Sequence, residues 1–82
     1  MTVIRKYWQI DYEILTMLAE GDKRVTEISN GCLINWLTAC RHLELMQSHM
    51  DVNESQKLWS ITDKGRKVLA QLKKKAAKEG KK

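Results

Sequence analysis

The sequence has 82 residues and a formal net charge of +5, which is the size of one small basic domain. A chain this short buries only about 60–65% of the surface that its unfolded form exposes, which disfavours a large enzyme with a deep cleft. Two cysteines are too few for a disulfide scaffold, and no apolar run approaches the roughly 18 residues of a membrane span. We therefore expect a soluble, intracellular, single-domain protein.

The positive charge is concentrated at the end of the chain. Residues 73–82 contain six lysines and one acidic residue, whereas residues 1–72 are neutral overall. We therefore expect a domain over residues 1–72 and a lysine-rich tail over residues 73–82, partly helical and then frayed. Such tails bind polyanions, usually nucleic acid, or serve only to keep a protein soluble. The tail lysines expected to add electrostatic affinity are Lys73, Lys74, Lys75 and Lys78.

The first half of the chain predicts a long helix followed by a short one. Apolar residues recur at helical spacing over residues 7–20, which predicts an amphipathic helix that Gly21 ends. Residues 23–25 are expected to form a brief strand. Thr26 then fits the N-cap of a second helix, with about one and a half turns before Gly31. A helix this short depends on packing against the rest of the domain.

A third helix is predicted over residues 36–48, with Asn35 as its N-cap. Its helical projection gives an apolar stripe that is expected to face the core. This stripe consists of Trp36, Ala39, Cys40, Leu43 and Met46. The opposite face mixes polar and apolar side chains, namely Leu37, Thr38, Arg41, Leu45 and Ser48.

Beyond residue 48 the hydrophobic pattern changes from a helical to an alternating period. Residues 49–52 and 57–61 alternate polar and apolar side chains on either side of the polar loop 53–56, which is typical of a β-hairpin. Thr62 then fits the N-cap of a last helix. The apolar stripe of that helix consists of Val68, Leu69 and Leu72.

The predicted order α-β-α-α-β-β-α is mainly helical with a small hairpin, an α+β fold. Within this order, the segments IDYEIL (10–15), TEI (26–28) and WSITDKG (59–65) resemble those of winged helix-turn-helix proteins. The likeness is to the small archaeal transcriptional regulators, cellular and viral, and it covers about residues 8–72. Two departures are that no glycine joins the third helix to the wing, and that Lys57 is the only basic residue of the wing.

The resemblance implies binding of double-stranded DNA, with the third helix as the recognition helix in the major groove. The positions that it places toward DNA are Asn35, Trp36, Leu37, Thr38 and Arg41. Arg41 either reads guanine through its two-pronged guanidinium or contacts only phosphate or solvent. Leu37 fits a thymine methyl group, and Thr38 fits a thymine methyl group or a phosphate. Trp36 has two interpretations, because the helical projection turns it inward and the family position turns it outward.

Phosphate contacts are expected from two further places. Thr26 lies beside two basic residues at the start of the second helix, where backbone N–H groups favour an anion. Ser55, Gln56 and Lys57 lie in the wing and are expected to play the same part. The alternative for both places is ordinary polar loop surface.

Apolar residues near both chain ends predict a homodimer, in which the two recognition helices would lie about 34 Å apart. The candidate interface residues are Val3, Ile4, Tyr7, Trp8, Leu69 and Leu72. The alternative is that these side chains pack on their own core.

The cysteine and histidine spacing matches no metal site, and the chain has no glycine-rich phosphate loop. We therefore predict no enzymatic activity, metal, cofactor, small-molecule effector or membrane association. The function predicted is sequence-specific binding of duplex DNA by a transcriptional regulator in the cytoplasm, at the nucleoid. The alternatives are a winged-helix protein-interaction module without DNA binding, which the neutral body favours, and a non-specific chromatin-like protein, which the tail favours.

Overall fold

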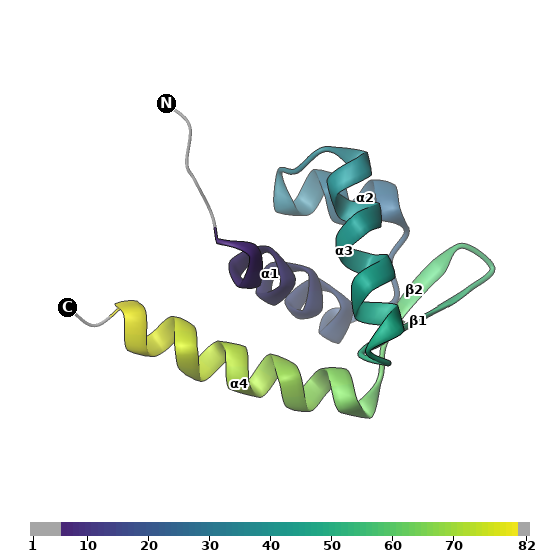
Figure 1. Ribbon diagram of the computed structural model, residues 1–82. Helices are drawn as coiled ribbons and strands as arrows, with labels where there is room; N and C mark the ends of the chain where they lie inside the picture. Colours follow the sequence, from purple (N-terminus) through teal and green to yellow (C-terminus); the bar gives the residue numbers. More distant parts are fainter. Residues whose placement is uncertain (1–5, 81–82) are drawn as a thin grey trace.

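The structure is a computed structural model that describes the backbone of residues 6–80 and the side chains of residues 6–78. Within these residues, helices and one antiparallel hairpin follow in the order α1, α2, α3, β1, β2, α4 (Figure 1). Their bounds are α1 Tyr7–Glu20, α2 Val25–Cys32, α3 Trp36–Ser48, β1 Val52–Ser55, β2 Leu58–Ile61 and α4 Asp63–Gly80. The predicted α+β fold with a wing is confirmed.

The brief strand predicted over residues 23–25 is reduced to a single bridge. Lys23 pairs with Trp59 of β2 through two backbone hydrogen bonds of 3.1 and 2.8 Å, while Val25 already belongs to α2. The helix begins this early because its first turn is capped one residue before Val25. The bridge still fastens the connection between α1 and α2 to the wing.

The caps of α2 and α3 differ in how well the sequence predicted them. Arg24, not Thr26, is the N-cap of α2, and its backbone N–H donates to Oε1 of Glu27 at 2.9 Å. Thr26 therefore lies inside the first turn. Asn35 caps α3 as predicted, because its Oδ1 accepts from the backbone N–H of Thr38 at 2.7 Å.

The hairpin begins later than the alternating pattern predicted. Val52 pairs with Ile61 and Ser55 with Leu58, which leaves only Gln56 and Lys57 in the turn. Both turn residues have positive φ, of 52° and 67°, as the two-residue turns that suit the twist of a hairpin require. The prediction of a loop over 53–56 was wrong because residues 49–51 belong to the turn that ends α3, so their alternation is not that of a strand.

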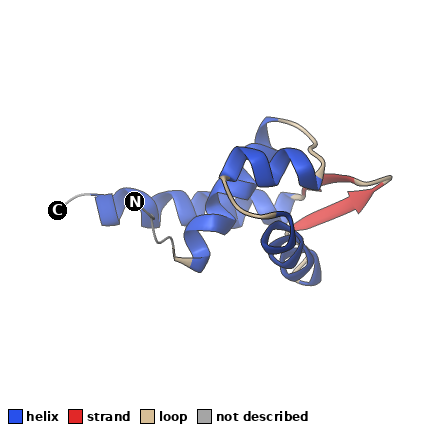
Figure 2. Cartoon of the chain, turned by 90° about the horizontal axis from the view of Figure 1, so that it is seen from above, coloured by secondary structure: helices blue, strands red, loops and turns tan. Residues whose placement is uncertain are grey.

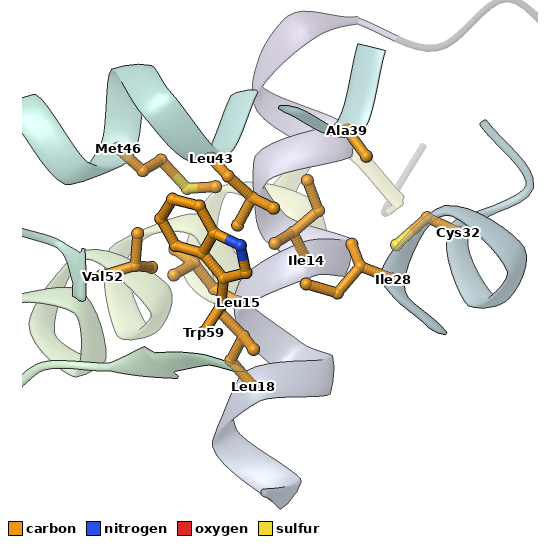
Figure 3. Close-up of a cluster of buried hydrophobic side chains, with 10 residues drawn as sticks. All are labelled: Ile14, Leu15, Leu18, Ile28, Cys32, Ala39, Leu43, Met46, Val52 and Trp59. Atoms are coloured by element: carbon orange, nitrogen blue, oxygen red, sulfur yellow. The ribbon is translucent and has the colours of Figure 1, made fainter. Parts of the chain in front are cut away.

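The core lies where α1, α2, α3 and the hairpin meet, and α4 covers it along α1 (Figures 1 and 3). Trp59 reaches into it from β2 with 8% of its surface exposed, and Figure 3 shows its indole in the middle of the cluster. The buried apolar side chains are Ile14, Leu15, Leu18, Ile28, Cys32, Ala39, Leu43, Met46, Val52 and Trp59. The apolar stripe predicted for α4, Val68, Leu69 and Leu72, is half-buried against this cluster.

Thr62 and Gly65 of the segment WSITDKG hold the start of α4 against the backbone that precedes β1. The hydroxyl of Thr62 accepts from the backbone N–H of Gly65 at 2.9 Å, which makes it the predicted cap. The same hydroxyl lies 2.9 Å from the carbonyl oxygen of Asp51, and the backbone N–H of Thr62 donates to that carbonyl at 3.0 Å. The first turn of α4 is thus pressed against the backbone between α3 and β1, and Gly65 is buried there.

The helical projection of α3 missed a buried polar contact with α1. His42 was assigned neither to the apolar stripe nor to the opposite face, but only 3% of it is exposed. Its Nδ1 lies 2.6 Å from Oδ1 of Asp11, and the ring of Tyr7 stacks on the imidazole with the centroids 3.9 Å apart. A buried imidazole is tolerated here because a carboxylate partners it.

Asp11, the partner of His42, makes the stability of the fold depend on pH. Burial raises the pKa of Asp11 above its ordinary value of 3.8, against the opposite influence of His42. The folded state then holds the proton more tightly than the unfolded state, so stability falls as pH rises from 3.8 through the raised pKa.

We therefore expect the wild type to lose free energy of unfolding relative to Asp11→Asn as pH rises through that window. Urea unfolding of both proteins in steps of pH measures the difference. A wild-type advantage that grows with pH over the same window would contradict the assignment.

The residues predicted to form a dimer interface make contacts within the chain wherever they are described. Val3 and Ile4 lie outside the described residues. Tyr7 stacks on His42 and is still 54% exposed. The ring of Trp8 is half-buried, with Nζ of Lys75 over it at 4.7 Å from the centroid. Leu69 and Leu72 pack against the core.

Candidate nucleic-acid interface

The face of α3 that points away from the core is built by a tight turn. Three residues separate α2 from α3, and the first of them, Leu33, is left-handed with φ 57°. In Figure 1, α2 lies behind the first half of α3, and the side of α3 that faces away from α2 is uncovered. Leu37 is 55% exposed there, and Asn35 and Arg41 are also exposed, whereas Thr38 is half-buried.

Of the two orientations considered for Trp36, the structure shows the outward one. It was included in the apolar stripe, yet 57% of it is exposed. The inward interpretation was wrong because Trp36 is the first residue of α3, where the helix extends past the core that Ala39 and Leu43 reach. An indole exposed to this degree at the start of α3 is available to a binding partner.

A groove of about 420 Å³ separates the start of α3 from the wing and the start of α2. Three residues that the sequence singled out separately, Thr26, Trp36 and Lys57, line it together. Its complete lining is Arg24, Val25, Thr26, Trp36, Glu54, Lys57 and Trp59. The volume lies within the range of about 300–1,000 Å³ that is usual for ligand sites.

Two charged residues of the groove were missed by the sequence reasoning. Arg24 was treated only as a neighbour of Thr26, and Glu54 was assigned to a loop. Glu54 instead lies opposite Trp59 in the β-ladder. Directly paired residues share one face of a hairpin, so the correct register would have placed Glu54 beside Trp59. The signal that was lacking was the two-residue turn.

The remaining predicted contact residues lie outside the lining of the groove. Asn35 is occupied in capping α3. Leu37 and Arg41 lie on the exposed face of α3, and Ser55 and Gln56 are exposed at the tip of the wing. The described surface therefore offers two adjoining regions: the outer face of α3, and the groove between α3 and the wing.

The tail lysines lie on an ordered helix, far from these two regions. α4 continues to Gly80, where the sequence predicted fraying, so Lys73, Lys74, Lys75 and Lys78 are helical. The wing and the C-terminal end of α4 lie at opposite ends of the domain (Figures 1 and 2). Lys75 is also a packing residue, because it covers Trp8.

Within the described residues, no three His, Cys, Asp or Glu side chains are grouped so as to hold a metal ion. In the same part of the chain, no helix combines the length and the apolar character that crossing a membrane demands.

The comparisons with known proteins agree with this architecture. The model of the winged helix-turn-helix family matches residues 5–80, and the chain belongs to that family. Sso10a-2, described as a DNA-binding protein from Sulfolobus solfataricus, superposes with a TM-score of 0.82 at 20% identity, over 93% of this chain and 83% of that one. ZitR of Lactococcus lactis gives a TM-score of 0.75 at 20% identity, over 95% of this chain. The chain spans only 56% of ZitR, and no curated protein matches the sequence.

Proposed function

We propose that this protein is a sequence-specific duplex-DNA-binding protein that regulates transcription, without catalytic activity, in the cytoplasm at the nucleoid. The observation that carries the proposal is the uncovered outer face of α3, where Arg41 and Leu37 are exposed, in a domain that also has a wing. An α-helix fits the major groove, which is about 12 Å wide. Arginine and an apolar side chain on one helix face recognise guanine and the thymine methyl group.

The groove and the wing supply the phosphate contacts of the proposal. Arg24 and Lys57 place positive charge on two sides of the groove, and Thr26 adds a hydroxyl. Ser55 and Gln56 continue this polar surface at the tip of the wing. Contacts of this kind fix the orientation of a protein on DNA and carry no sequence information. We further propose that the protein binds as a homodimer, supported by the exposure of Tyr7.

The second candidate is a protein-interaction module. The exposed apolar side chains Leu37 and Leu45 on the outer face of α3, with Trp36 exposed at the start of the helix, favour it. Titration of a duplex from the upstream region of the gene and of a scrambled duplex, at about 50 and 200 mM salt, separates the possibilities. Tighter binding to the first duplex supports the proposal, equal binding indicates a chromatin-like protein, and no binding favours the interaction module.

The lysines of α4 are proposed to add affinity that depends on salt. Lys73→Gln, Lys74→Gln and Lys78→Gln are combined, whereas Lys75 is retained because it covers Trp8. Removing one lysine–phosphate interaction should flatten the plot of log affinity against log salt by about 0.9, so the three substitutions together should flatten it by up to about 2.7. Fluorescence anisotropy with a labelled duplex measures the slope. An unchanged slope would show that these lysines do not touch DNA.

A further inference from the structure

The groove between α3 and the wing contains aromatic side chains for which the binding of duplex DNA provides no role. Trp36 is 57% exposed and lines the groove, and the mostly buried Trp59 belongs to the same lining. In duplex DNA the faces of the bases are stacked on one another, so an indole at a groove edge has no base face to meet. An unpaired base has both faces free, and stacking on aromatic side chains is how single strands are commonly held.

The charges around the indole suit the rest of a nucleotide. Arg24 and Lys57 come from the start of α2 and from the hairpin turn, so they offer positive charge to a phosphate from two directions. A positively charged groove combined with a stacking aromatic ring is the arrangement of single-strand binding surfaces. A volume of about 420 Å³ is large enough for one nucleotide.

Glu54 is the one acidic residue in the lining, and it limits which bases fit. An ionised carboxylate only accepts hydrogen bonds. It therefore pairs with the amino group of cytosine, adenine or guanine, and glutamate is a known partner of the cytosine amino group. Thymine has no amino group, and its one ring donor, N3–H, lies between two carbonyl oxygens that the carboxylate repels, so thymine should fit this position less well.

We propose that the groove binds one unpaired nucleotide of a single strand, stacked on Trp36, with its phosphate between Arg24 and Lys57 and an amino-bearing base at Glu54. This activity goes beyond the duplex binding proposed above. Because Arg24, Thr26 and Lys57 are also the groove residues proposed to contact duplex phosphates, single strands and duplexes should compete for the protein.

Anisotropy with labelled strands of about 12 nucleotides tests the stacking step. Trp36→Leu should weaken binding of the cytosine strand by between about 5- and 150-fold, and Trp36→Phe should retain most of it. Leu45→Ala is the matched control, since Leu45 is an exposed apolar residue of the same helix that lies outside the lining. It should leave single-strand affinity unchanged.

The base preference is tested by comparing cytosine and thymine strands. The cytosine strand should bind more tightly by at least about 5-fold, and Glu54→Gln should shrink this ratio toward one, because an amide also donates. Free deoxycytidine monophosphate at the same concentration of bases should compete less well, because only a strand also brings the phosphates of neighbouring nucleotides to the positive charges of Arg24 and Lys57. Equal competition would indicate a site for free nucleotides and overturn the single-strand assignment.

Absence of single-strand binding, or equal weakening by Trp36→Leu and Leu45→Ala, would overturn the proposal. The duplex titration run alongside keeps the two proposals apart. If duplex binding persists while the cytosine strand does not bind, only the groove assignment fails. If the cytosine strand binds and no duplex does, the groove assignment stands without the regulator proposal.

Discussion

Replacing Gly65 with alanine should destabilise the domain by about 3 kcal/mol, although alanine is the better helix former by about 0.8–1 kcal/mol. Gly65 lies in the first turn of α4, pressed on the backbone that leads from α3 to the wing. A Cβ atom there would lie 2.0 Å from the carbonyl oxygen of Asp51 and 2.8 Å from Cγ1 of Ile61. The carbonyl belongs to the backbone, so the helix itself must move, and this cost exceeds the gain in helix propensity.

Urea unfolding followed by circular dichroism measures the effect of Gly65→Ala. The matched control is Lys67→Ala, which introduces alanine at an exposed position of the same helix and should change stability by less than about 0.5 kcal/mol. A variant of Gly65 as stable as the wild type would show that α4 does not pack closely on this turn. The wing would then lack the anchor at Thr62 and Gly65 that fixes its position beside α3.

Arg41→Ala should lower affinity for the preferred duplex by about 1–3 kcal/mol, which is a factor of about 5–150, and affinity for a scrambled duplex much less. Arg41 is exposed on α3, so its removal should leave the fold intact. The reason for the difference is that bidentate bonds to guanine O6 and N7 exist only on the correct sequence.

Anisotropy titrations of both duplexes measure the effect of Arg41→Ala. Arg66→Ala is the matched control, because it removes an exposed arginine from α4 instead of α3. It should weaken both duplexes alike or neither. Equal losses of affinity on both duplexes for Arg41→Ala would make this side chain a phosphate contact and leave the sequence specificity to other residues.

Local chemistry made several elements predictable from the sequence. Asn35 and Thr62 cap α3 and α4 as expected, since both supply a side-chain oxygen directly before an apolar helical stripe. The buried face of α1, formed by Ile14, Leu15 and Leu18, was predictable because apolar residues recur there at clear helical spacing. These signals depend on neighbours within one or two turns, so tertiary packing does not override them.

The features that the sequence did not predict depend on contacts between distant residues. Burial of His42 requires Asp11 of another helix, 31 residues away in the chain. Trp36 is exposed because α3 begins beyond the edge of the core. A helical projection does not show where a helix begins relative to the core. The groove at Glu54 depends on a hairpin register set by Gln56 and Lys57, residues that carry no strong turn signal.

The most direct test of the proposed DNA-binding role is to follow the backbone amide signals of the labelled protein by nuclear magnetic resonance while a duplex from its own upstream region is added. We expect shifts concentrated on the first half of α3 around Arg41, on the start of α2 around Thr26, and on the wing turn at Lys57. Amides in the middle of α1 should remain unshifted. Shifts confined to the lysines of α4, or no shifts at all, would contradict the proposed role.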